Sequence, residues 1–144
     1  MGILDILRIS ASGLKAQRTR MEVVASNLSN VHTTKTAEGG PYKKKEVVFT
    51  TSDVSEDKSF NGLLSKSIEG VKVDSIQESP KSFEKVYDPN HPDADQDGYV
   101  TYPNVNLMEE MTDMVAATRA YEANINVLNT TKEMIIKSLE IGKQ

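Results

Sequence analysis

The sequence predicts a mostly α-helical fold of the α+β class, in which long N- and C-terminal helices pair as an antiparallel coiled coil with short strands between them. In residues 1–31 and again in 104–144, apolar residues recur at the alternating three- and four-residue spacing of a heptad seam. The prolines and the β-prone runs are confined to residues 32–103. We therefore expect three parts: an N-terminal helix (1–31), a β-rich insert with loops (32–103) and a C-terminal helix (104–144). The insert should lie at one end of the helix pair.

The N-terminal segment contains no proline and has the apolar stripe of a long helix. Gly13 and several serines and asparagines are weak helix formers, so this helix should be only marginally stable alone in water. A second apolar stripe beside the first widens the apolar face, which indicates that the helix needs packing partners. The first stripe falls at Leu4, Leu7, Ala11, Leu14, Met21, Ala25 and Leu28, and the second at Ile3, Val24 and Val31.

The insert contains three short runs with the apolar and β-branched residues of strands, at 45–50, 68–73 and 98–102. Stretches rich in Gly, Pro and Asn at 39–41 and 88–92 predict turns or loops between them.

The C-terminal segment has clear helix boundaries. Asn106 can cap the first turn, Glu109 follows three residues later as in a capping box, and Gly142 lies where the helix should stop. Eight of the ten expected seam positions are apolar. The seam is Leu107, Met111, Met114, Thr118, Tyr121, Ile125, Leu128, Lys132, Ile135 and Leu139.

The residues expected to form helix-packing or assembly contacts combine large seam side chains with asparagines. An asparagine inside a helix is favoured where its amide can hydrogen-bond across a helix contact and fix the register. Helix-end capping is the alternative, and it fits Asn30 best. The expected set is Leu7, Leu14, Met21, Asn27, Leu28, Asn30, Met111, Tyr121, Asn124, Ile125, Leu128 and Ile135.

Composition argues against several classes of function. Lys and Arg number 17 against 21 Asp and Glu, a net charge of -4, which disfavours a nucleic-acid-binding domain. The run Lys43–Lys45 is interpreted as a solvated strand edge. Without cysteine, and with two histidines in predicted loops, the chain lacks the residues of most metal and nucleophilic sites. No phosphate-binding, dinucleotide-binding or nucleophile-elbow motif occurs, so we expect no enzyme activity, no cofactor and no small-molecule substrate.

One motif needs separate treatment. Asp93, Asp95 and Asp97, followed by Gly98, match the first half of an EF-hand calcium loop. The position that should hold a bidentate glutamate is Asn104, and the prolines before the motif prevent an entering helix. A turn in which these carboxylates cap nearby backbone N–H groups is the favoured interpretation, and a calcium-responsive binding module is the alternative.

An ordered series of short blocks resembles the bacterial flagellar basal-body rod protein family, most closely its short proximal rod members. Together the blocks cover both ends and most of the chain. They are residues 11–17, 25–30, 33–36, 38–42, 47–49, 98–100, 102–106, 109–111 and 119–124.

This resemblance implies a structural subunit of the proximal rod, whose terminal helices form a coiled coil in the wall of a helical tube. That tube is a drive shaft, transmits motor torque to the hook and filament, and forms part of the export channel wall. Implied partners are copies of the chain, other rod proteins, an export-gate or membrane-ring adaptor at the rod base, and the surrounding rings. Export by the flagellar type III apparatus needs no cleaved signal peptide, and the N-terminus lacks the features of one. A soluble coiled-coil adaptor, complete as a monomer or dimer, is the other alternative.

Overall fold

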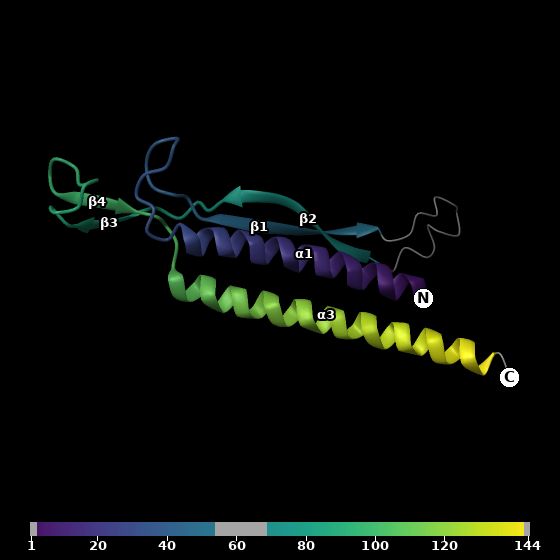
Figure 1. Ribbon diagram of the computed structural model, residues 1–144. Coiled ribbons are helices and arrows are strands. Elements are labelled where there is room, and N and C mark those ends of the chain that lie inside the picture. The colour runs from purple at the N-terminus through teal and green to yellow at the C-terminus, as the bar shows by residue number, and fades with distance from the viewer. Residues whose placement is uncertain (1–2, 54–68, 143–144) are drawn as a thin grey trace.

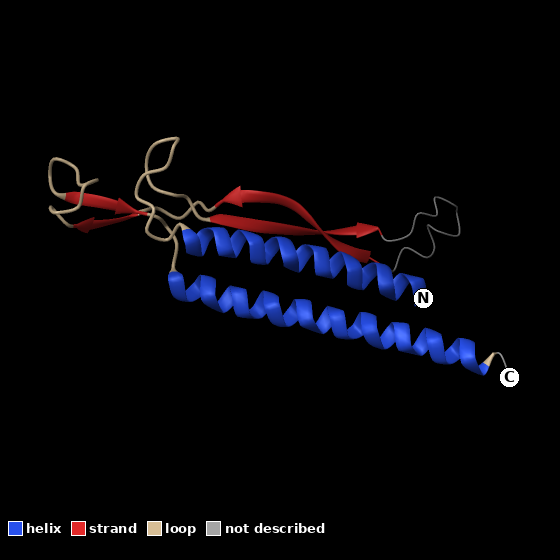
Figure 2. Cartoon of the chain, in the orientation of Figure 1, coloured by secondary structure: helices blue, strands red, loops and turns tan. Residues whose placement is uncertain are grey.

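The computed structural model describes residues 3–53 and 69–142. Their elements follow one another as α1 (Ile3–Ser29), β1 (Lys45–Asp53), β2 (Glu69–Glu78), β3 (Glu84–Tyr87), β4 (Tyr99–Tyr102) and α3 (Leu107–Ile141). Helix α1 lies between α3 on one side and the β1–β2 hairpin on the other (Figure 1). The β3–β4 hairpin extends beyond the end of these layers, as the strands in Figure 2 show. The predicted α+β class is confirmed.

The wide apolar face of α1 explains why this helix is covered on two sides. Val23 and Val24 point about 100° apart on a helix, yet both are buried, as is Ala16 one heptad earlier. The expectation that the whole insert lies at one end of the helix pair is therefore wrong for its larger hairpin. Strands β1 and β2 run along α1, where the Val71 N–H donates to Ser12 Oγ at 3.2 Å, and only β3–β4 lies at the end.

The two helices run in opposite directions (Figure 1). Arg20 pairs with Asp113 at 2.7 Å, Thr118 donates to Met21 Sδ at 3.6 Å, and Asn27 donates to Glu110 at 2.9 Å. Farther along, Gly13 lies against Asn124. This register places Ile3 beside about residue 134, so the last two turns of α3 extend beyond the first turn of α1. Supercoiling of the pair in an assembled state stays a prediction.

Both hairpins are antiparallel. Strands β1 and β2 pair from Lys45 and Glu78 to Asp53 and Glu69, with a bulge between Val48 and Phe49. Strand β4 pairs with β3, which the sequence did not predict. All four residues of β3 are exposed, so its sequence has no alternation of buried and exposed positions to reveal a strand. It is held by pairing with β4, whose Val100 is fully buried.

Helix α3 begins as the capping pattern predicts. The side chain of Asn106 accepts hydrogen bonds from the N–H groups of Met108 (2.9 Å) and Glu109 (3.2 Å). Gly142 is the C-terminal cap residue, and its N–H donates to the Ser138 carbonyl. Neither of the described helices is apolar enough over a sufficient length to cross a membrane.

The close approach of the helices at Gly13 gives a first prediction. A Cβ at residue 13 would lie 3.1 Å from Asn124 Nδ2. In an Asn124→Ala background, Gly13→Ala should stabilise the fold by up to about 1 kcal/mol, because alanine favours the helix. With Asn124 present the gain should be smaller, because the amide must move. Urea unfolding of the four proteins in this double-mutant cycle measures the coupling, and additive effects would contradict the close contact.

Candidate functional site

A buried polar cluster, here called the junction, lies where the end of α1, the start of β1 and the start of α3 meet. Its centre is formed by Asn27 and Glu110, each with only 1% of its surface exposed, and by Lys44 at 8%. Buried polar groups are costly unless they are paired, so each contact here constrains the relative positions of three chain segments.

Asn27 uses the full bonding capacity of its amide. Its Nδ2 donates to Glu110 Oε2 at 2.9 Å and to the Lys45 carbonyl at 2.8 Å. Its Oδ1 accepts from the Lys45 N–H and from the Tyr42 hydroxyl, both at 3.0 Å. A side chain with two donors and two acceptor sites fits this position, so a single residue links the two helices and the first strand.

Lys44 balances the buried charge of Glu110. Its Nζ lies 2.7 Å from Glu110 Oε1 and 3.8 Å from Glu109 Oε2. Burial by itself would lower the pKa of the Lys44 ammonium. Hydrogen bonding and charge attraction from Glu110, with weaker attraction from Glu109 and Glu46, outweigh burial and raise this pKa above its ordinary value of 10.5. The Lys44 ammonium is therefore charged at neutral pH.

Asn104 extends the junction to the outer hairpin. Its Oδ1 accepts from the Lys44 N–H at 2.8 Å, and its Nδ2 donates to the Lys81 carbonyl at 2.7 Å. Successive backbone N–H groups at the start of β1 are thus bound by two asparagines, Asn104 and Asn27. The segments that enter and leave the β3–β4 hairpin are tied to the same place as the helices.

The asparagines of the expected set have three different environments. Asn27 bonds across the helix contact, as described. Asn30 donates to the Ser26 carbonyl at 2.9 Å and accepts from the Thr33 hydroxyl, which is local helix-end bonding. Asn124 donates to the Ala120 carbonyl at 3.0 Å within its own helix and faces Gly13.

The apolar members of the set are partly buried, with one exception. Met111 is 51% exposed and lies outside the contact with α1. The fully buried positions of α3 are Glu110, Ala117 and Thr131, each one residue before a predicted seam residue. A close helix contact selects the small Ala117 and the bonded Glu110, whereas the prediction followed the largest apolar side chains. The partly buried members are Leu7, Leu14, Met21, Leu28, Tyr121, Ile125, Leu128 and Ile135.

Of the residues that form the junction, only Asn27 belongs to the set expected from the sequence. Glu110 is absent from that set and Lys44 is interpreted there as part of a solvated strand edge, yet both are buried. Lys43 fits that interpretation, since it is exposed and pairs with Glu78 at 2.9 Å. An isolated sequence gives no sign that one lysine of three turns inward, because the distinction depends on Glu110 across the fold.

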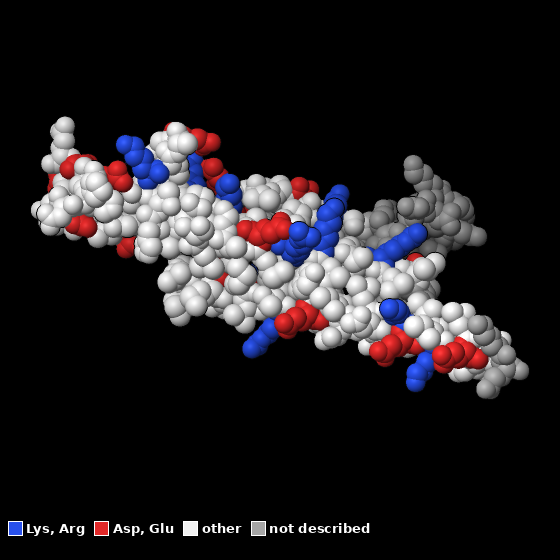
Figure 3. All heavy atoms as spheres, viewed as in Figure 1, with Lys and Arg blue, Asp and Glu red and all other residues white. Residues whose placement is uncertain are grey.

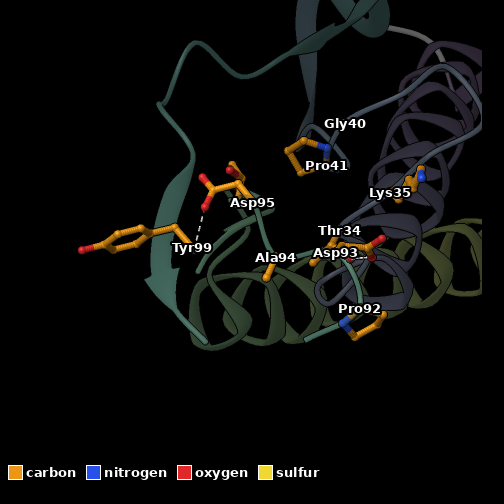
Figure 4. A pocket seen from close by; sticks show the side chains of 10 residues that line it. Thr34, Lys35, Gly40, Pro41, Pro92, Asp93, Ala94, Asp95 and Tyr99 are labelled. Carbon is orange, nitrogen blue, oxygen red and sulfur yellow. Dashed lines mark hydrogen bonds between the residues drawn. The ribbon is translucent and has the colours of Figure 1, made fainter. Parts of the chain in front are cut away.

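The Asp-rich loop forms local turns. Asp95 Oδ1 accepts from the N–H groups of Asp97 (3.0 Å) and Tyr99 (2.9 Å), and Asp93 accepts from the Thr34 hydroxyl at 2.7 Å (Figure 4). Thr34, Asp93, Asp95 and Tyr99 line an open hollow of about 420 Å³ between two loops. Within residues 3–53 and 69–142, no three acidic or histidine side chains gather closely enough to hold a metal ion. The Asp95 carboxylate stabilises its own loop, and the Asp93 carboxylate joins this loop to Thr34.

Comparison with known proteins covers nearly the whole chain. Residues 7–35 match the family model described as flagella basal body rod protein, and residues 96–141 match the one described as flagellar basal body rod FlgEFG protein C-terminal. The flagellar basal-body rod protein FlgC of Bacillus subtilis is 46% identical, with 95% of this chain and 96% of the relative covered. Proteins of the same name from Borreliella burgdorferi (40% identical, 98% of each chain) and Salmonella typhimurium (41%, 99% of this chain and 100% of the relative) are also similar.

The bonding of Asn27 gives a second prediction. Asn27→Ala leaves the Glu110 carboxylate, the Lys45 N–H and the Tyr42 hydroxyl without their partner, and should lower the free energy of unfolding by about 3 kcal/mol. Asn30→Ala is the matched control and should cost about 1 kcal/mol or less, because its bonds are local. Urea denaturation followed by circular dichroism measures both. Equal losses would mean that the junction does not hold the fold together.

The raised pKa of Lys44 gives a third prediction. The ammonium binds its proton more tightly in the folded state, so its stabilising contribution is complete below pH 10.5 and is lost as the pH rises through the folded pKa. Thermal midpoints measured from neutral pH upward should therefore fall more steeply above pH 10.5 in the parent than in Lys44→Gln. Lys85→Gln is the control: Lys85 is exposed on β3, so this variant should retain the parent's steep fall.

Proposed function

The chain belongs to the family of flagellar basal-body rod proteins, and from this membership we propose that it works as a structural subunit of the proximal rod. In this role the subunit carries load through its geometry and packing, with no chemical step. The rod it helps to build is a helical drive shaft that transmits motor torque to the hook and filament and forms part of the export channel wall.

Similarity from end to end to proteins named as rod subunits is the observation that carries the proposal. The exposed surface of the single chain supports it. A compact monomer of this mass exposes about 7,400 Å², whereas this chain exposes 10398 Å². An elongated subunit that covers part of its surface on assembly would account for such an excess.

The assembly surface is proposed to include α3, which packs on α1 along one side only. Nine large apolar side chains of α3 are exposed in the single chain. Coiled-coil contacts with neighbouring subunits would cover them, with the terminal helices (1–31 and 104–144) forming the inner wall and the insert (32–103) the outer part. The exposed residues are Leu107, Met108, Met111, Val115, Val127, Met134, Ile136, Leu139 and Ile141.

The proposed partners follow from the same role. They are further copies of the chain, other rod proteins, an adaptor at the membrane-ring base and the rings around the rod. The subunit would reach the rod through the flagellar export apparatus without a cleaved signal peptide.

Deletion of the gene in the native host tests the proposal. We expect cells without hooks, filaments or motility, restored by the parent gene, and purified basal bodies that contain the chain. Intact flagella after deletion, or basal bodies that lack the chain, would overturn the proposal.

Substitutions in the helix pair give a fourth prediction. Leu14→Ala and Ile125→Ala should each destabilise the assembled rod by about 2–5 kcal/mol, because a partly buried side chain is removed from a contact that assembly completes. Swimming diameter in soft agar and the yield of basal bodies should both fall. Ile76→Ala, which truncates a half-exposed residue of β2, is the control for lost side-chain volume. Normal motility in both helix variants would contradict the packing role.

A further inference from the structure

Two exposed apolar surfaces lie at opposite ends of α3. The first, here called the outer groove, is a hollow of about 370 Å³ lined by Met108, Met111, Thr112, Val115, Ala116 and Arg119. Met108 is 70%, Met111 51% and Val115 52% exposed, although all three are large apolar side chains. On the face seen in Figure 3, the beginning of α3 is largely uncharged and charged side chains follow farther along.

The second surface, here called the overhang, comprises residues 134–141, which extend past the first turn of α1 (Figure 1). Ile136 and Leu139 are 45% and 63% exposed, and they lie on one side of the helix together with Glu140, since residues three or four apart share a helix face. Leu139 lies in the predicted seam. Within a single chain it is not covered by α1, because the first residue of α1, Ile3, lies beside about residue 134.

We propose that the overhang of one subunit docks in the outer groove of a second copy. The inference rests on the proposed rod function and names the contact that links successive copies. Apolar side chains that are left open at both surfaces would be removed from water together, which favours the contact.

The charges beside the two surfaces are complementary. Arg119 lines the outer groove and has no ion-pair partner within the described part of the chain. Glu140 lies between Leu139 and Ile141 on the overhang and is likewise unpaired there. Docking in the proposed direction would bring this carboxylate to the guanidinium, and attraction of opposite charges would select the orientation.

The separation of the two surfaces determines the kind of assembly. Met111 and Leu139 are 28 residues apart on one continuous helix, which is about 42 Å. A surface at each end that fits the other makes a head-to-tail contact, which extends into an open chain of subunits instead of closing as a two-fold dimer. Two standard contacts would take about 1,600 Å² of surface from each subunit.

Disulfide cross-linking tests the contact directly, because the chain has no cysteine of its own. In the variant Met111→Cys/Leu139→Cys, the two cysteines lie too far apart to form a disulfide within one molecule. Any disulfide therefore joins two copies. Oxidation of the purified full chain and of isolated basal bodies should give a ladder of dimers and higher species on non-reducing gels. Met111→Cys/Lys72→Cys, with its second cysteine on the exposed face of β2, should give none.

Charge reversal checks the direction. Arg119→Glu should reduce the cross-linked fraction about tenfold, equivalent to about 1.4 kcal/mol, and adding Glu140→Arg should restore it. Failure of the ladder in both samples while the variant is present in basal bodies would overturn the inference and leave the rod function intact. Cross-links from Met111→Cys alone, or only to a different protein, would also overturn it. Absence of the chain from basal bodies would instead reject the rod function.

Discussion

The hydrogen bond between Asn27 and Glu110 is the constraint on which the rest of the structure depends. It joins residues 83 positions apart in the interior of a chain with few fully buried apolar side chains. Apolar burial alone is tolerant of small shifts, whereas a buried carboxylate with two fixed partners is not. We regard the junction as the element that selects one arrangement of the helices and hairpins from the many that a small, elongated core would permit.

The two helices have different roles within this arrangement. Helix α1 is covered on both sides and forms the core of the single subunit. Helix α3 contributes one side to that core and leaves its other sides open, with large apolar residues near both ends. An isolated α1 would be marginal, but between α3 and the β1–β2 hairpin its weak helix propensity is offset by packing. The subunit therefore keeps its own geometry and still has surface free for neighbours.

Local and periodic features were predictable from the sequence, and long-range ones were not. The helices, the capping role of Asn106 and three of the four strands follow from patterns within a few residues. The path of the β1–β2 hairpin and the burial of Lys44 and Glu110 depend on residues far away in the chain. Among the junction residues, Asn27 was found because an asparagine inside a helix is unusual. Met111 is half-exposed in the single chain, so its expected packing or assembly contact stays a prediction.

The spacing of the helix contacts along the chain also bears on folding. The contacts of α1 with α3 join residues 83 to 111 positions apart, and β2 pairs with β1 across an intervening segment. Contacts this distant in sequence form slowly, because a long loop must close first. A chain that emerged from a narrow conduit with its N-terminus leading would have the β1–β2 hairpin as a partner for α1 but would lack α3 until its last quarter appeared. Such a chain would complete its fold only after release.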